Sequence, residues 1–165
     1  MSPDSRRWPR VGVGYDSHRF APGGPLILGG IAIPSDVHLD GHSDGDAIAH
    51  AVTDAILGAM SLGDIGEMFA DTDPANAGRD SIEMLRLATE RVRAAGWSVH
   101  QVDVVVIAES PKIAPHRDAM RDRIAGALGI GHADVSIKGK TNERMGFVGR
   151  GEGIACMATA MVVPG

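Results

Sequence analysis

Residues 13–18 read V-G-Y-D-S-H, and residues 41–50 read G-H-S-D-G-D-A-I-A-H. The first segment is expected to be extended, and because alternate side chains of a strand share one face, Asp16 and His18 should point the same way. The second segment leads into a helix expected over residues 46–60, which carries His50. A carboxylate and two imidazoles that converge from a strand and a helix predict a metal site with a fourth position open, as catalytic zinc is usually held.

Other interpretations of this cluster stay open. An Asp-x-His pair is common by chance, and a histidine on an alanine-rich helix is usually a core or surface residue with an ordinary hydrogen bond. Asp46 lies four residues before His50 and therefore on the same helical face. It either accepts the second ring N–H of His50, as partners of metal-bound imidazoles do, or is an acidic residue that favours the helix dipole.

Length and composition are typical of one soluble globular domain. The chain has 165 residues, of which 44% are hydrophobic and 22% charged. Its net charge of -5 gives no basic footprint for nucleic acid, and no apolar run is long enough to span a membrane. Residues 1–9 are expected to form a flexible tail ahead of a domain over residues 10–165.

The cysteine count and the N-terminus indicate a cytoplasmic protein. The single cysteine, Cys156, excludes an internal disulfide and fits a reducing compartment. Its small and apolar neighbours predict a buried, inert thiol. Arg6, Arg7 and Arg10 form a small basic cluster, but no apolar signal core follows them, so no secretion signal is expected.

Hydrophobic periodicity predicts an α+β fold. Strands are expected over residues 11–15, 26–33, 102–108, 135–138 and 154–163. Helices are expected over residues 46–60, 80–95 and 116–128; Asp80 and Glu83 resemble a capping box, and glycines follow the last two helices. We therefore predict a single domain with a mixed β-sheet whose one face is covered by helices.

Two of the loops between these elements are rich in polar residues. Residues 62–74 carry the carboxylates of Asp64, Glu67, Asp71 and Asp73, which suit polyol hydroxyls or a metal but equally describe a solvated acidic loop. Residues 108–115 read A-E-S-P-K-I-A-P. A backbone held by two prolines can contact a base edge, and Lys112 can contact a phosphate, although such a segment alone is merely a strand-to-helix turn.

Two further loops follow near the C-terminus. Residues 138–143, K-G-K-T-N-E, combine cations, a hydroxyl and a carboxylate, which suits phosphates and a hard cation such as magnesium. Residues 146–153 read G-F-V-G-R-G-E-G, where glycines allow close backbone approach and Arg150 can bind an anion bidentately. As a dinucleotide fingerprint this glycine pattern is weak, because no helix is expected after it.

These motifs, in this order, resemble those of the 2-C-methyl-D-erythritol 2,4-cyclodiphosphate synthase family, enzymes of the non-mevalonate isoprenoid pathway. The resemblance covers residues 11–163, and several ordered motifs are far more specific than any one of them. The motifs are G-Y-D-S-H (14–18), H-S-D-G-D-A-I-A-H (42–50), L-G-D-I-G (62–66), F-A-D-T-D-P (69–74), the turn at 110–112, K-T-N-E (140–143) and G-F-V-G-R-G-E-G-I-A-C (146–156).

The resemblance implies a homotrimer with an active site at each subunit boundary. It implies the substrate 4-diphosphocytidyl-2-C-methyl-D-erythritol 2-phosphate, whose 2-phosphate attacks the β-phosphorus of its own diphosphate arm, closes a ring and expels CMP. Such a phosphoryl transfer needs positioning and charge neutralisation, and its nucleophile is already an anion. The absence of a convincing nucleophile–base pair in the sequence fits that chemistry.

Residue roles follow from the same resemblance. Asp16, His18 and His50 would hold Zn²⁺ or another divalent transition metal, and Glu143 would hold Mg²⁺ or Mn²⁺ on the diphosphate. His42 and Thr141 would stabilise the transition state. Asp64 and its neighbours would hold the erythritol hydroxyls, and residues 108–114 the cytosine. The full set implied to contact substrate is Asp16, Ser17, His18, His42, Ser43, Asp64, Ile65, Gly66, Phe69, Ala70, Asp71, Thr72, Asp73, Ala108, Glu109, Ser110, Pro111, Lys112, Ile113, Ala114, Lys140, Thr141, Asn142, Glu143, Phe147 and Arg150.

Some positions depart from the family pattern. Tyr15 stands where phenylalanine is frequent, and Lys140 where threonine is also common. The resemblance places Phe147 and Arg150 near the trimer axis, where a cavity would take an isoprenoid diphosphate, a phosphate or a sulfate. In the alternative, Arg150 pairs with a carboxylate such as Glu152 and the axis is empty. Ser17 should point away from the metal.

Two other function classes remain. A zinc-dependent phosphohydrolase would use the same ligands but let water attack, giving a linear product. A non-catalytic trimeric module would bind nucleotides or isoprenoid diphosphates without turnover, although the presence of all the metal and phosphate positions argues against it.

Overall fold

The computed structural model describes residues 8–165, and residues 1–7 lie outside the described part. Most of the expected tail, including Arg6 and Arg7, therefore cannot be compared with the structure; Trp8 and Pro9 have no regular structure. In chain order the strands and helices are β1 (Arg10–Pro22), β2 (Leu26–Leu28), β3 (Ile31–Ile33), β4 (Val37–Leu39), α1 (Ala47–Met60), α2 (Ile65–Met68), α3 (Ser81–Ala94), β5 (Trp97–Ile107), α4 (Arg117–Leu128), β6 (Val135–Lys140), α5 (Gly146–Gly149) and β7 (Gly153–Pro164), with 3₁₀ turns at Pro74–Asn76, Ala114–His116 and His132–Asp134.

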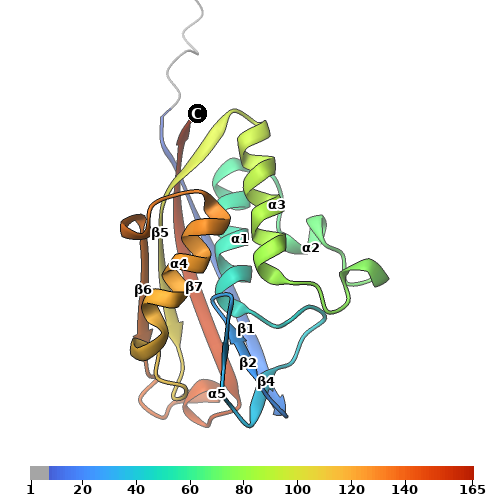
Figure 1. Cartoon of the computed structure of the whole chain (residues 1–165), viewed down its shortest axis with the longest axis vertical. Coiled ribbons are helices and arrows are strands. Elements are labelled where there is room, and N and C mark those ends of the chain that lie inside the picture. Colours follow the sequence, from blue (N-terminus) through green and yellow to red (C-terminus); the bar gives the residue numbers. More distant parts are fainter. Residues whose placement is uncertain (1–7) are drawn as a thin grey trace, which may run out of the picture.

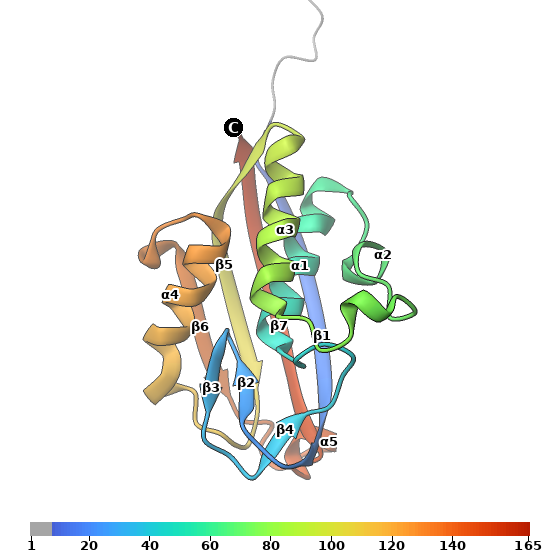
Figure 2. The ribbon, with the colours of Figure 1, turned by 45° about the vertical axis from the view of Figure 1, so that its right-hand side comes forward.

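One five-stranded sheet has the order β4-β1-β7-β5-β6. β5 and β6 are parallel, and α4 forms the connection between them; the other neighbours are antiparallel. Helices α1, α3 and α4 lie on the same side of this sheet (Figures 1 and 2). The predicted α+β domain with a mixed sheet and helices over one face is therefore confirmed.

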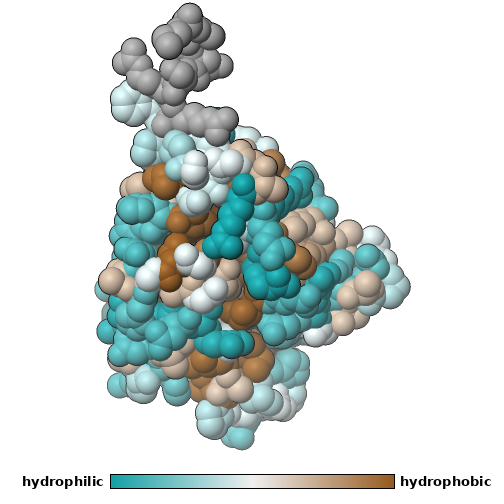
Figure 3. Space-filling view, turned by 45° about the horizontal axis from the view of Figure 1, so that its top comes forward, coloured by the Kyte–Doolittle hydropathy of each residue, from teal (hydrophilic) through white to brown (hydrophobic). Residues whose placement is uncertain are grey.

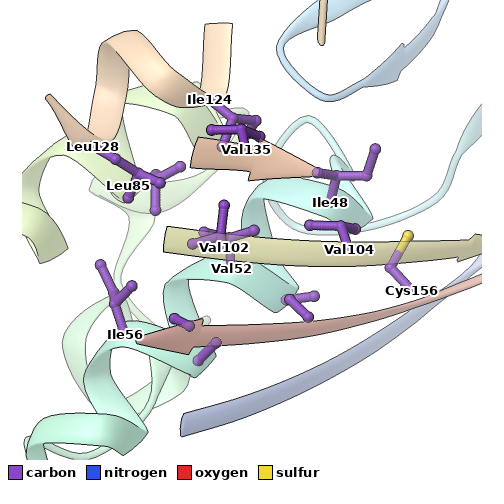
Figure 4. Close-up of a cluster of buried hydrophobic side chains, with 14 of the residues drawn as sticks. Ile48, Val52, Ile56, Leu85, Val102, Val104, Ile124, Leu128, Val135 and Cys156 are labelled. Carbon is purple, nitrogen blue, oxygen red and sulfur yellow. The ribbon is translucent and has the colours of Figure 1, made fainter. Parts of the chain in front are cut away.

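The core lies between the sheet and these helices. Figure 4 shows Ile48, Val52 and Ile56 of α1 facing Val102 and Val104 of β5. Leu85, Ile124, Leu128 and Val135 complete this part of the core, and Cys156 of β7 is buried in it. The expected burial of Cys156 is confirmed, and burial raises the pKa of its thiol well above its usual value.

The opposite face of the sheet is apolar, and none of residues 8–165 buries its side chains. Val11, Val13 and Tyr15 of β1 and Met157 of β7 are exposed there, and Tyr15 lies directly opposite Met157 in the strand pairing. We call these four residues the outer sheet face. The surface in Figure 3 is by contrast mainly polar, with apolar residues in smaller patches. No helix among residues 8–165 is long and apolar enough to cross a membrane.

Several predicted boundaries were wrong. Residues 26–33 form a hairpin, β2 and β3, rather than one strand, because Gly29 and Gly30 adopt positive φ angles and reverse the chain. β1 continues to Pro22, because it pairs with β7 as far as Arg19 and then with β4, and β5 begins at Trp97, because it pairs with the end of β7. The short elements β4, α2 and α5 were not predicted, and α4 begins at Arg117 after a 3₁₀ turn.

Candidate functional site

The predicted metal ligands come together where α1 crosses β1. The Oδ2 atom of Asp16 lies 2.8 Å from Nε2 of His18 and 3.1 Å from Nδ1 of His50, and the two nitrogens are 3.2 Å apart. Ser17 is exposed and, by strand alternation, lies on the other face, as expected. The prediction that a strand and a helix bring these three groups to one point is confirmed.

Two glycines of β1 make this approach feasible. A Cβ atom on Gly12 would lie 2.0 Å from the carbonyl oxygen of Ala55, and one on Gly14 would lie 1.8 Å from that of Ala51. Helix α1 therefore packs its backbone directly against the strand, which leaves His50 within reach of the ligands that follow on β1. Any larger residue at Gly12 or Gly14 would push the helix, and His50 with it, away from Asp16.

The three groups fit a divalent transition metal. Ligand atoms about 2.0–2.1 Å from a tetrahedral zinc lie roughly 3.3–3.4 Å from one another, only slightly farther apart than the atoms of this cluster. Burial disfavours the carboxylate of Asp16, but hydrogen bonds and charge from His18 and His50 lower its pKa. Burial likewise disfavours the charged ring of His18, but Asp16 raises its pKa. A cation bound between these three groups would take the place of the protons in their hydrogen bonds.

The ring nitrogens that face away from the cluster have partners of their own. Nδ1 of His18 lies 2.7 Å from the carbonyl oxygen of Asp40. Nε2 of His50 lies 2.8 Å from Oγ of Ser81 and 3.0 Å from Oγ of Ser43. Ser81 is fully buried, and its hydroxyl bonds to the carboxylate of Asp44. Sequence reasoning missed Ser81 and Asp44. The number of residues that separates each of them from His50 does not indicate a contact.

The interpretation of Asp46 as the partner of the second ring nitrogen of His50 is wrong. Asp46 is the N-cap of α1, and its carboxylate accepts from the backbone N–H of Ala49 at 3.1 Å, Gly29 at 2.8 Å and Gly30 at 2.6 Å. The interpretation of Asp46 as an acidic residue at the helix start is therefore the better one. Asp46 also ties the β2–β3 turn to that helix start.

A cavity of about 260 Å³ opens above the triad, and we call it the metal cavity. Exposed His42 and half-buried Ser43 lie in its wall beside the metal ligands. It also contains residues predicted to hold the substrate hydroxyls. The lining residues are Asp16, His18, Gly41, His42, Ser43, His50, Ile65, Gly66, Phe69, Asp71, Asn76 and Met84.

The carboxylates of the acidic loop beside this cavity are exposed, and two of them cap short helical turns. Asp64 is the N-cap of α2 and accepts from the N–H of Glu67, and Asp73 accepts from the N–H of Ala75. Asp54 of α1 accepts from the N–H of Ile65 at 2.8 Å, which joins α2 to α1. Ala70 and Thr72 are exposed in the same loop.

A second cavity, of about 230 Å³, contains most of the residues predicted to hold the cytosine, together with Lys140 and Thr141. Its lining includes exposed Lys112, Lys140 and Thr141 and the backbone of the turn after β5; the set is Ala108, Glu109, Pro111, Lys112, Ile113, Ala114, Arg117, Gly139, Lys140 and Thr141. Within this chain the second cavity and the metal cavity have no lining residue in common.

Two carboxylates organise the edge of the second cavity. Oε1 of Glu109 accepts from the N–H of Asn142 at 3.0 Å and from that of Arg144 at 3.1 Å. Glu109 thus joins the turn after β5 to the turn after β6. The hydroxyl of Thr141 lies 3.1 Å from Oε1 of Glu143, and both side chains are exposed. Ser110 is also exposed here.

Phe147 and Arg150 form a third group, away from the linings of both cavities. Phe147 is exposed in α5. Arg150 follows that helix, and its Nε donates to Oε1 of Glu152 at 2.7 Å, which matches the alternative of an arginine paired with a carboxylate. The structure thus divides the predicted site residues among three places on one chain.

Comparison with known proteins gives consistent results. The model of the YgbB family matches residues 9–163. A protein of Gemmatimonas aurantiaca named 2-C-methyl-D-erythritol 2,4-cyclodiphosphate synthase is 63% identical over 154 residues, which are 93% of each chain. The solved structure of IspF from Plasmodium falciparum, a CDP complex, has a TM-score of 0.84 and 35% identity over 97% of this chain and 99% of that one. The bifunctional IspDF of Campylobacter jejuni has a TM-score of 0.93 and 39% identity over 97% of this chain, but only 43% of that longer chain is covered.

Proposed function

Because the chain belongs to the YgbB family, we propose that its metal cavity carries out the ring closure for which its relatives are named. The chain converts 4-diphosphocytidyl-2-C-methyl-D-erythritol 2-phosphate to 2-C-methyl-D-erythritol 2,4-cyclodiphosphate and CMP, in the non-mevalonate pathway. The structural observation that carries the proposal is the convergence of Asp16, His18 and His50 on one point at the wall of a cavity large enough for a phosphorylated polyol.

The reaction balances without an external proton acceptor. An oxygen of the 2-phosphate bonds to the β-phosphorus, the bond from that phosphorus to the bridging oxygen breaks, and CMP leaves with that oxygen. The attacking group is already an anion, so the chain has to position it and offset its charge. Holding both ends of one molecule makes the attack intramolecular, and effective molarity then contributes on the order of 7–11 kcal/mol.

Asp16, His18 and His50 would hold a divalent ion, with zinc as the metal that best matches one carboxylate and two imidazoles. When bound, this ion supplies the positive charge that offsets repulsion between the attacking phosphate and the diphosphate. His42 and Ser43, in the wall of the same cavity, would contact the phosphate, and Ile65, Gly66 and Asp71 the methylerythritol hydroxyls.

The second cavity would hold the cytidine half of the substrate. The backbone of residues 108–114 offers donors and acceptors to a base, and Lys112 and Lys140 offer charge to the diphosphate. Thr141 would contact the transferring phosphoryl group, and Glu143 would hold Mg²⁺ or Mn²⁺ on the diphosphate. The Plasmodium falciparum relative was solved as a CDP complex, which supports a cytidine diphosphate subsite in this fold.

A homotrimer would bring the metal cavity of one copy together with the second cavity of another. One chain keeps its metal cavity and its second cavity apart, and its outer sheet face is apolar and uncovered. Packing of the outer sheet faces of three copies would bury these residues and place the second cavity of one copy beside the metal cavity of another. Substrate would then lie at each subunit boundary.

On the axis of that trimer, Arg150 would occur three times and could hold a phosphate, a sulfate or an isoprenoid diphosphate, with Phe147 and Tyr15 around its apolar part. The contact from Arg150 to Glu152 competes with such an anion, since the guanidinium already has a carboxylate partner. Axial binding therefore requires an anion that displaces Glu152 from Arg150 in the assembled protein.

Product analysis tests the proposed reaction. The purified protein, given the substrate with zinc and magnesium in water enriched in oxygen-18, should release CMP together with an unlabelled cyclic diphosphate. A labelled linear product would establish a phosphohydrolase instead, and binding of the substrate without CMP release would establish a non-catalytic module.

A further inference from the structure

One metal ligand, His50, is joined to a second helix by buried polar groups. Its Nε2 atom lies 2.8 Å from Oγ of Ser81, the first residue of α3, and Ser81 has no exposed surface. The hydroxyl of Ser81 continues to the carboxylate of Asp44, in the loop that leads into α1. These contacts run from Asp44 in the loop, through Ser81 of α3, to the metal ligand His50.

The Asp44 carboxylate fixes the direction of the hydrogen bond that joins it to Ser81. Oδ1 of Asp44 accepts from the N–H of Asp46 at 3.1 Å, and Oδ2 accepts from the N–H of Ser81 at 3.1 Å, so this carboxylate acts as an acceptor throughout. The Ser81 hydroxyl therefore donates its single proton to Asp44. Its oxygen is then left to accept; the hydroxyl of Ser43 lies 3.4 Å away, and the nearer group is Nε2–H of His50 at 2.8 Å.

The protonation pattern of the His50 ring follows. A neutral imidazole with its proton on Nε2 has a bare lone pair on Nδ1. That Nδ1 atom is the one that faces Asp16 and His18, at 3.1 Å and 3.2 Å, so a bound cation would take the place of a proton there. We propose that Ser81 and Asp44 are positioning residues that orient the His50 ring with Nε2–H toward Ser81 and Nδ1 toward the metal.

The hydroxyl of Ser81, rather than that of Ser43, is the one that positions the His50 ring. Ser43 lies farther from Nε2, at 3.0 Å, and is only half-buried in the wall of the metal cavity, where water can replace it. No water can replace Ser81, which has no exposed surface, so its removal leaves the buried N–H of His50 without its nearest acceptor. The other imidazole, His18, is oriented by the backbone carbonyl of Asp40, which no side-chain substitution removes.

The inference rests on the proposed metal site, and its test uses zinc alone, without substrate. Ser81→Ala should weaken zinc binding about 10- to 100-fold in competition with a chromophoric chelator, the usual effect of removing such a partner. Asp44→Ala should weaken it in the same direction. Asp80→Ala is the matched control, because Asp80 caps the same helix end through the N–H of Ile82 but does not contact His50. This variant should bind zinc like the wild type.

Nitrogen-15 NMR of the zinc-bound protein gives a second measurement that a loosened helix would not explain. The His50 ring should bind zinc through Nδ1 and keep its proton on Nε2 in the wild type and in Asp80→Ala, and in Ser81→Ala the Nε2 proton should exchange with water faster because its nearest acceptor is gone. A wild-type ring that binds zinc through Nε2, or equal zinc affinities for Ser81→Ala and Asp80→Ala, would overturn the inference while leaving the metal site in place. A wild type that binds no divalent ion would overturn both.

Discussion

The metal cavity and the second cavity are built in different ways. In the metal cavity the three predicted metal ligands are partly or fully buried, and the imidazoles of His18 and His50 are each held on both ring nitrogens by contacts within the chain. In the second cavity the side chains Lys112, Lys140 and Thr141 are exposed, and the strongest contacts, those of Glu109, hold backbone rather than reactive groups. One chain therefore brings together a candidate metal triad but leaves the side chains of the second cavity exposed.

The largest effect should come from the metal cavity. His50→Ala removes one of three ligands, and we expect a loss of activity on the order of 10³-fold or more, because metal-derived charge stabilisation amounts to several kcal/mol. The fold should persist, since the core around Ile48 and Val52 is unchanged. Elemental analysis should show loss of the metal from this variant, and an unchanged metal content would refute the ligand assignment.

The free energy of unfolding should change most when Asp46 is replaced, the N-cap of the helix that carries His50. Asp46→Ala leaves the buried N–H groups of Gly29, Gly30 and Ala49 without an acceptor, which should lower the free energy of unfolding by on the order of 3 kcal/mol. Asp80→Ala, which removes an exposed helix cap, should cost about 1 kcal/mol. Chemical denaturation measures the free energy of unfolding of both variants. Equal losses of that free energy would show that the β2–β3 turn does not depend on Asp46.

A substitution in the second cavity should cause a smaller loss of activity, and it should leave zinc binding unchanged. Thr141→Ala removes an exposed hydroxyl and should lower kcat by about 10²-fold, as loss of one donor to a transition state does. Zinc content and thermal stability should stay at the wild-type level, because within residues 8–165 the Thr141 hydroxyl bonds only to the neighbouring Glu143. A loss of zinc in this variant would remove the distinction between the two cavities.

Sequence reasoning found the ligands whose positions depend on local geometry. Asp16 and His18 share a face because any strand alternates, and α1 and α3 were placed to within a residue because Asp46 and Asp80 mark their starts. The length of β1 was underestimated, since its polar second half is held by pairing with β7 rather than by strand propensity.

What sequence reasoning missed depends on contacts between distant segments. Ser81 comes 31 residues after His50 on another helix, and nothing in the spacing indicates that the two side chains meet. For Asp46, a separation of four residues from His50 suited both interpretations, and the approach of Gly29 and Gly30 distinguished them. The assignment of Thr141 and Arg150 came from family resemblance, and one chain does not bring them to the metal.

Complementation between two inactive variants tests most directly whether the site is shared between copies. His50→Ala lacks a metal ligand and Thr141→Ala lacks the hydroxyl of the second cavity, so a mixed trimer contains a boundary where both halves are intact. Co-expression with two affinity tags isolates such trimers. They should show about a third of the wild-type activity, because a threefold ring with both variants has one intact boundary among its three. Activity no greater than that of the two separate variants would show that the site lies within one chain and would contradict this account.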